Sequence, residues 1–144
     1  MISTPVAQER KCFEMLLVED NPGDVILIQE SLKDIKAGII LHVVKDGAEA
    51  VNFLLKNPPY ERSPMPDLIL LDINLPKKSG LEVLREIRSH PEVKSVPVVV
   101  LTTSRSDKDI LRSYGLGANS FVTKPIGFHE FMASIHSIVN NFVR

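Results

Sequence analysis

The sequence predicts an α/β protein in which a five-stranded parallel sheet is doubly wound, with helices on both faces. Three observations support this. Five short apolar runs alternate with longer segments whose apolar residues recur at helical spacing. Several runs are almost continuous Val, Ile and Leu, which suits strands that are covered on both faces. The length of 144 residues fits one domain with a sizeable core.

Each apolar run is expected to form one strand, and turn-favouring residues separate the runs. Their sequences are FEMLLVED, IILHVVKDG, DLILLD, VPVVVLT and NSFVTK, at 13–20, 39–47, 67–72, 96–102 and 119–124. Because helical segments lie between them, successive strands are expected to be connected by right-handed crossovers. The proline-rich segment 56–67 is expected to be an ordered surface loop.

Helix start signals follow the first three strands. Asn21 followed by Pro22 is typical of an N-cap and a first helical position. Asp46, with Glu49 three residues later, resembles a capping box. Ser79 is expected to begin a third helix. Each β-strand of the first half is therefore followed by a helix with its own start signal.

Apolar residues at helical spacing predict which helix faces are buried. In the first helix these residues are Val25, Ile28, Leu32 and Ile35. In the third they are Leu81, Leu84 and Ile87. A short fourth helix is expected at 106–117, where glycine ends it. The last helix is expected to place its stripe in the core, namely Phe128, Phe131, Ile135, Ile138 and Phe142.

Composition excludes several classes of protein. A net charge of −1 gives no sign of nucleic-acid or membrane-surface binding. The apolar runs are too short to span a bilayer, and the N-terminus lacks the apolar core of a signal peptide. Cys12 is the only cysteine, so a reducing cytoplasm is the expected location. Residues 1–13 are expected to be a polar tail, and 14–144 the folded domain.

Polar side chains stand where four of the expected strands end. Glu19 and Asp20 end the first strand, Asp72 the third, Thr102 the fourth and Lys124 the fifth. Ligands of an open parallel sheet bind beyond the carboxyl ends of its strands. Three acids, a hydroxyl and an amine are therefore expected to converge at one edge of the sheet.

This combination suits phosphoryl transfer. Close carboxylates repel one another, and Mg²⁺ relieves that repulsion because it prefers a few carboxylates plus water and phosphate oxygens. Asp72 is able to act as a nucleophile toward phosphorus, while Lys124 and Thr102 neutralise and hydrogen-bond the phosphoryl group. Taken alone, Asp72 is equally consistent with a turn residue, Thr102 with an ordinary strand end and Lys124 with a solvated lysine. Their conjunction favours function.

The motifs LLVEDNPGD, LILLDINLPKKSG, VVVLTTS and FVTKP occur in the order of the receiver domain of two-component response regulators. The chain resembles that family from about Met15 to Phe142, with Pro76 and Gly80 four and eight residues after Asp72. The resemblance implies the flavodoxin-like receiver fold. It also implies a phosphoacceptor that catalyses its own phosphorylation and dephosphorylation, not a turnover enzyme.

The resemblance further implies a role for individual residues. Asp72 would accept a phosphoryl group from a phosphohistidine of a sensor histidine kinase. Asp20 and Asp72 would bind Mg²⁺, with Glu19 assisting and the backbone carbonyl of Asn74 as a further ligand. Lys124 would bond to a phosphoryl oxygen.

Other implied features concern switching. Thr102 would donate to the phosphoryl group, and Phe121 would turn inward when Thr102 moves; Phe121 is almost equally consistent with a plain core aromatic residue. Side chains at Asn74 and Ser104 would flank the phosphoryl group and tune its lifetime. The peptide bond between Lys124 and Pro125 would be cis.

The family also implies partners. No second domain follows in the sequence, so a single-domain regulator with a protein target is expected. The target would contact the fourth helix, fifth strand and fifth helix, roughly 106–142. The loop 56–67 and the motifs LPKKSG and VVVLTTS resemble the receivers that accompany bacterial phytochrome kinases. A homodimer, with Phe128, Phe131 or Phe142 partly at its interface, stays open.

Three alternatives remain. A haloacid-dehalogenase-like phosphatase also uses an aspartate nucleophile, but it needs a second Asp where this chain has Asn74. A flavodoxin-like cofactor binder needs a phosphate loop after the first strand, where the acids of EDNPGD would repel phosphate. A phosphate-independent pseudo-receiver, used as an interaction module, is the third. The four histidines lack metal-ligand spacing and are interpreted as structural.

Overall fold

The computed structural model describes residues 12–103, 115–124 and 127–143. Within these ranges the chain alternates between strands and helices, as the sequence predicts. The elements are β1 (Phe13–Val18), α2 (Pro22–Ser31), β2 (Ile39–Val44), α3 (Gly47–Leu55), β3 (Leu68–Asp72), α4 (Gly80–Ser89), β4 (Val98–Thr102), β5 (Ser120–Thr123) and α6 (Phe128–Val143). β1 begins at Phe13, one residue before the expected start of the domain.

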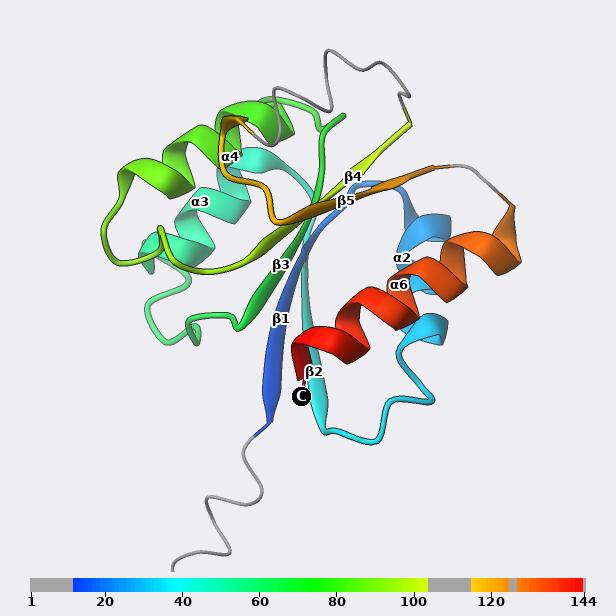
Figure 1. The fold of residues 1–144 in the computed structure, drawn as a ribbon. Helices are drawn as coiled ribbons and strands as arrows, with labels where there is room; N and C mark the ends of the chain where they lie inside the picture. Colours follow the sequence, from blue (N-terminus) through cyan, green and yellow to red (C-terminus); the bar gives the residue numbers. More distant parts are fainter. Residues whose placement is uncertain (1–11, 104–114, 125–126, 144) are drawn as a thin grey trace, which may run out of the picture.

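The five strands form one sheet in the order β2-β1-β3-β4-β5, and every neighbouring pair is parallel. Figure 1 shows α3 and α4 on one face of this sheet and α2 and α6 on the other. The predicted doubly wound architecture is confirmed. β3 and β4 are buried at all their residues, because neighbouring strands flank them and helices cover both of their faces.

Each face of the sheet carries its own hydrophobic core. Leu16, Ile69 and Val98 point toward the α3/α4 face. Met15, Leu68 and Val99 point toward the α2/α6 face. Neighbouring residues of one strand thus serve opposite cores, which explains why the strands are apolar runs without polar alternation.

The predicted helix starts are confirmed. The side-chain oxygen of Asn21 accepts the N–H of Asp24 at 3.1 Å, and Pro22 is the first helical residue. Asp46 Oδ1 accepts the N–H of Glu49 at 2.8 Å. The carboxylate of Glu49 accepts instead from the hydroxyl of Tyr60 in the proline-rich loop, at 2.7 Å.

The reciprocal capping box occurs in α4. Ser79 Oγ accepts the N–H of Glu82, and Glu82 Oε1 accepts the N–H of Ser79, at 3.3 and 3.0 Å. Two orphan backbone donors are thereby satisfied at the start of the helix that follows Asp72.

Three helix predictions need correction or fall outside the described residues. α2 ends at Ser31, before Leu32 and Ile35, although tighter turns after the helix still bury both side chains. Phe128 is 73% exposed, so the predicted core stripe of α6 is wrong at its first residue. The helix expected at 106–117 lies largely outside the described residues.

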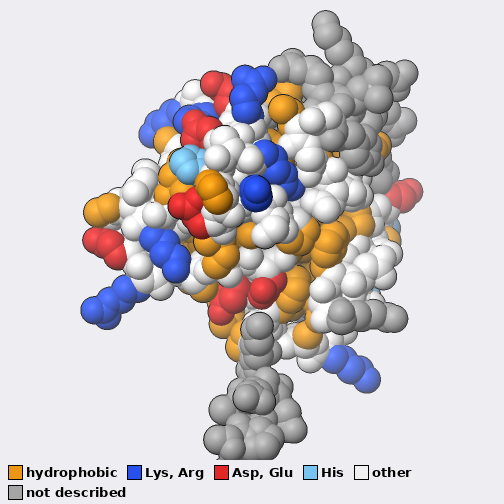
Figure 2. Space-filling model, turned by 60° about the vertical axis from the view of Figure 1, so that its left-hand side comes forward, with side chains coloured by type: hydrophobic (Ala, Val, Ile, Leu, Met, Phe, Trp, Pro, Cys, Tyr) orange, Lys and Arg blue, Asp and Glu red, His pale blue; other side chains and the backbone are white. Residues whose placement is uncertain are grey.

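Two surface features agree with the composition. Figure 2 looks onto the side of the molecule where α3 and α4 lie, and basic and acidic side chains are interspersed there. This face therefore shows no broad field of one charge sign. Among the described residues, no helix combines the length and apolar character needed to cross a membrane.

Candidate functional site

The strand register brings the predicted residues to one edge of the sheet. Val18 pairs with Leu71, so Glu19 and Asp72 both lie just beyond that pair. Thr102 pairs with Thr123, so Lys124 follows at the same end of β5. Because all strands are parallel, these residues lie at the carboxyl edge where the loops diverge.

Three acids come together there as predicted. One carboxylate oxygen each from Glu19, Asp20 and Asp72 lies within 4.8 Å of the other two. Glu19 and Asp72 are 1% and 3% exposed, whereas Asp20 faces solvent. Oxygen ligands that are this close, and only partly open to water, fit a hard divalent cation that keeps some of its own waters.

Lys124 reaches the same centre from β5. Its Nζ lies 2.8 Å from Glu19 Oε1 and 2.8 Å from Asp24 Oδ2. The distance from Nζ to Asp72 Oδ2 is 3.5 Å. The three donors of one ammonium thus face three carboxylates, and the lysine side chain is almost completely buried.

Burial and the neighbouring charged groups shift the pKa values of this centre. Loss of solvent, together with the neighbouring Asp72, raises the pKa of Glu19 to about 7 despite the nearby ammonium of Lys124. Burial by itself would lower the pKa of Lys124. Its hydrogen bonds to Asp24 and Glu19 and the charge of Asp72 outweigh this and raise that pKa above its ordinary value.

The loop after β3 orients Asp72. Its Oδ1 accepts the N–H of Asn74 at 2.9 Å. The amide nitrogen of the Asn74 side chain donates to Thr103 Oγ1 at 3.0 Å, which connects the β3 and β4 ends. A Cβ on Gly80 would collide with the backbone of Asp72 and Ile73, so only glycine lets α4 begin this close to the site.

The two expected switch residues lie on adjacent strands. Thr102 ends β4 and is 2% exposed. Phe121 is in β5, opposite Val100, and packs half-buried against the core of the α3/α4 face. Thr102 ends its strand as predicted, whereas the position of Phe121 against the core is equally that of a plain core aromatic residue. Ser104 and Pro125, which were expected to flank the phosphoryl group and to follow a cis bond, lie outside the described residues.

Sequence reasoning missed the contact of Asp24 with Lys124. Asp24 belongs to the acidic EDNPGD segment, but it was given no role of its own. The available signal was its place as the third residue of α2, directly after the capped turn that leaves the first strand.

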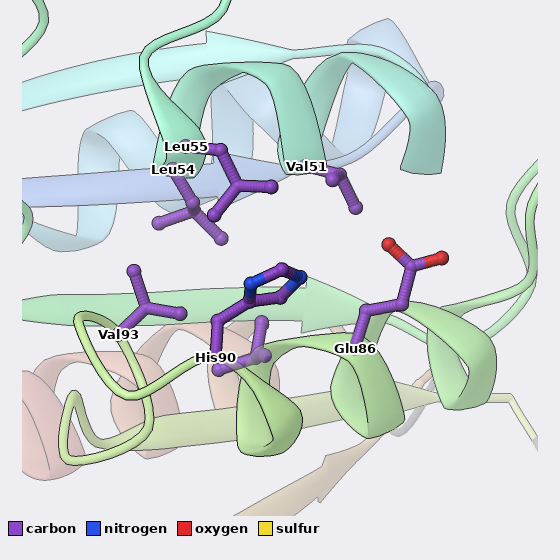
Figure 3. Close-up of a pocket in the computed structure, with 7 residues that line it drawn as sticks. Val51, Leu54, Leu55, Glu86, His90 and Val93 are labelled. Atoms are coloured by element: carbon purple, nitrogen blue, oxygen red, sulfur yellow. The ribbon is translucent and has the colours of Figure 1, made fainter.

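A hollow elsewhere in the molecule is a weaker candidate for a ligand site. It lies between α3 and α4 and is lined mainly by apolar side chains, with Glu86 and His90 at its α4 side (Figure 3). Its volume is about 10 Å³, which holds at most one water. The edge that contains Asp72 is therefore the stronger candidate.

Comparison with known proteins agrees with this geometry. The family model described as response regulator receiver domain matches residues 15–136. Response regulator Rcp1 from Synechocystis sp. is 45% identical over 124 residues, covering 86% of this chain and 84% of that protein.

Two solved structures are also similar. The phosphorylated cyanobacterial phytochrome response regulator RcpA is 41% identical, with a TM-score of 0.88 over 92% of this chain and 95% of that one. The Mn²⁺-bound form of Rcp1 is 45% identical, with a TM-score of 0.83 over 87% of this chain and 90% of that one. With the family model matching most of the sequence, this chain belongs to the response regulator receiver domain family.

Proposed function

We propose that this response regulator accepts a phosphoryl group on Asp72 from a phosphohistidine of a sensor histidine kinase, with Mg²⁺, and then switches a protein-binding surface. The convergence of buried Asp72 with two more carboxylates and the Lys124 ammonium supports this most directly. Residues 14–144 are proposed to form the receiver domain.

Asp72 is the proposed nucleophile. A carboxylate oxygen forms the new O–P bond while the P–N bond to the kinase imidazole breaks, and the electron pair returns to the imidazole. The hydrogen bond from Asn74 N–H to Asp72 Oδ1 fixes the orientation of the carboxylate. Lys124, which faces Asp72 Oδ2, neutralises the phosphoryl oxygens and thereby stabilises charge in the transition state.

The metal site is proposed to comprise Glu19, Asp20, Asp72 and the backbone carbonyl of Asn74. When bound, Mg²⁺ supplies positive charge that offsets both the carboxylates and the transferring phosphoryl group. The three carboxylates support this proposal through their close spacing. The Mn²⁺-bound structure of the relative Rcp1 supports the binding of a divalent ion.

Thr102 and Phe121 are the proposed switch. The Thr102 hydroxyl would donate to the phosphoryl group, and Phe121, in the adjacent strand β5, would turn inward. The surface that changes would comprise the helix expected at 106–117, strand β5 and helix α6, roughly 106–142. Of this surface, 115–124 and 127–142 fall within the described residues.

The kinase partner is proposed to be phytochrome-like, because RcpA is a phytochrome response regulator and is similar over most of both chains. Profiling phosphotransfer from purified histidine kinases would test this. We expect the fastest transfer from a kinase with a phytochrome sensor. A kinase of another sensor class that transfers fastest would contradict the narrower proposal and leave the receiver function intact.

The chain is proposed to act as a phosphoacceptor that catalyses its own phosphorylation and hydrolysis, not as a turnover enzyme. Asn74 stands where a dehalogenase-like phosphatase needs its second acid, and its amide is engaged with Thr103. A pseudo-receiver would keep the same fold without being phosphorylated. The small volume of the hollow between α3 and α4 offers no support for a flavin-like ligand there.

The test is incubation of the purified protein with acetyl phosphate and Mg²⁺. We expect an acid-stable, base-labile phosphate in the wild type that is absent from Asp72→Asn. Continuous release of phosphate from many unrelated esters would favour the phosphatase. A wild-type protein that takes up no phosphate would favour the pseudo-receiver.

A further inference from the structure

A closed ring of hydrogen bonds surrounds the ammonium of Lys124. Its Nζ donates to Glu19 Oε1 and to Asp24 Oδ2, each at 2.8 Å. Glu19 Oε2 in turn accepts the N–H of Asn21 at 3.3 Å, and Asn21 Oδ1 accepts the N–H of Asp24 at 3.1 Å. Both carboxylates that bind the lysine are thus oriented by the capped first turn of α2.

The two carboxylates differ in what else they face. Glu19 belongs to the group of three acids that suits a divalent cation, whereas Asp24 does not. A cation at that group and the ammonium of Lys124 would share the electron pairs of Glu19. The contact between Lys124 and Asp24 stays available whether or not a cation is bound, because Asp24 does not belong to the three acids that would hold the cation.

We propose that Asp24 is a positioning residue for phosphoryl transfer, because it holds the ammonium of Lys124 in place beside Asp72 when Glu19 is engaged by metal. This inference rests on the proposed function. The 3.5 Å between Nζ and Asp72 Oδ2 is long for a hydrogen bond, so this donor remains the one best placed for a phosphoryl oxygen. Within the described part of the chain, the Asp24 carboxylate is hydrogen-bonded to Lys124 Nζ and has no hydrogen bond to Asp72.

The surroundings of Asp24 make it suitable for substitution. The Asp24 side chain is 26% exposed. Together with Lys124 and Phe128 it lines a hollow of about 80 Å³ between α2 and the start of α6. This volume admits water, so a change at Asp24 leaves the hydrophobic core intact. Asp24→Asn keeps the shape but replaces the ion pair with Lys124 by a weaker hydrogen bond from the ammonium to a neutral amide oxygen.

The experiment measures the rate of Asp72 phosphorylation by acetyl phosphate at saturating Mg²⁺, for wild type and Asp24→Asn. We expect the maximal rate constant of Asp24→Asn to fall by about tenfold, the scale of one charge-assisted hydrogen bond. The half-saturating concentrations of acetyl phosphate and Mg²⁺ should stay within about twofold, because a positioning residue acts on the chemical step.

Glu30→Gln is the matched control. It removes a carboxylate from the exposed side of the same helix, where Glu30 pairs with Lys33 at 2.7 Å. Its rate should equal that of the wild type. Asp24→Ser, whose side chain is also compatible with a first helical turn, is the second variant in case Asp24→Asn does not fold.

A double-substitution cycle tests whether Asp24 acts through the lysine. Lys124→Met should slow phosphorylation, and Asp24→Asn should then cost nothing further in that background. An equal further loss in the Lys124→Met protein would overturn the inference, as would a wild-type rate for Asp24→Asn. If the wild type itself gains no phosphate on Asp72, the proposed function fails and the inference falls with it. A phosphorylated wild type beside an equally fast Asp24→Asn refutes the inference alone.

Discussion

At the residue scale, Glu19 makes the stability of the metal-free protein depend on pH. Its pKa is raised from 4.5 to about 7 by burial and by Asp72, so the folded state binds more protons than the unfolded state between these values. The stabilising contribution is therefore complete below about pH 4.5 and is lost as the pH rises through about 7.

Urea unfolding in the presence of a chelator measures this contribution. Between about pH 5 and pH 8, the free energy of unfolding of the wild type should fall relative to that of Glu19→Gln, whose amide does not titrate. Parallel pH profiles for the two proteins would show that Glu19 does not titrate in this range.

The same carboxyl also governs metal affinity. A divalent cation requires the deprotonated carboxylate, so protons compete with metal below the raised pKa of about 7. Calorimetric titration with Mg²⁺ should show about tenfold tighter binding at about pH 8 than at about pH 6. A pH-independent affinity would mean that Glu19 contributes nothing to the metal site.

The roles of single residues were predictable where the residue ends a strand. They were not predictable where the residue contacts another that is distant in the sequence. Asp72 and Lys124 follow apolar runs, and their meeting follows from parallel strands alone. The contact between Asp24 and Lys124 joins residues 100 positions apart and has no periodic pattern that announces it. Asn21 was correctly identified as a cap, but its N–H bond to Glu19 required the folded loop.

At the scale of elements, the start of α4 determines how open the carboxyl end of β3 remains. The capping box of Ser79 and Glu82 fixes the helix start, and Gly80 lets this start approach the backbone of Asp72. A side chain at this position pushes the helix away from the strand end or displaces Asp72.

Gly80→Ala should therefore lower the free energy of unfolding by about 1–3 kcal/mol, the usual cost of overpacking. It should also slow phosphorylation of Asp72. Gly115→Ala is the control, because a Cβ there would meet no atom of the described residues within 4 Å. Urea unfolding of both variants provides the measurement, and equal stabilities would contradict the steric role of Gly80.

Helix ends were harder to predict than helix starts. Asn21, Asp46 and Ser79 carry side-chain acceptors that satisfy the first backbone donors, so each start has a chemical signal. The end of α2 has no glycine or proline, and its apolar spacing continues through Leu32 and Ile35. The tighter turns there bury the same side chains, so the periodic pattern does not distinguish them from helix.

At the scale of the whole molecule, two cores hold the sheet between its helix layers, and α6 contributes to one of them. Phe131 is 3% exposed and packs into the α2/α6 core, whereas Phe128, on the same helix, is 73% exposed. The spacing of apolar residues in α6 predicts that both side chains are buried, because this spacing does not show where the helix leaves the core.

Phe131→Ala should cost about 3–5 kcal/mol of unfolding free energy, as expected for a buried aromatic side chain. Phe128→Ala should change it by less than about 0.5 kcal/mol. Urea unfolding of the pair tests the correction to the sequence-based core. A large loss for Phe128→Ala would mean that this side chain is covered, as in a homodimer.

The parallel sheet and the helix layers on both of its faces were predictable because strand and helix segments alternate along the chain. The outward position of Phe128 and the ring of hydrogen bonds around Lys124 were not, since the first depends on how α6 packs against α2 and the second on how the end of β5 meets α2. The overall fold thus followed from local patterns, while the fine geometry of the site followed from packing between layers.

The central claim is that Asp72 carries the phosphoryl group. The most direct measurement is to treat the protein with acetyl phosphate and Mg²⁺, reduce it with borohydride, and map the digest by mass spectrometry. Borohydride converts an aspartyl phosphate to homoserine, and we predict homoserine at position 72 and at no other aspartate. Homoserine elsewhere, or an unmodified Asp72 in a protein that has incorporated phosphate, would contradict the claim.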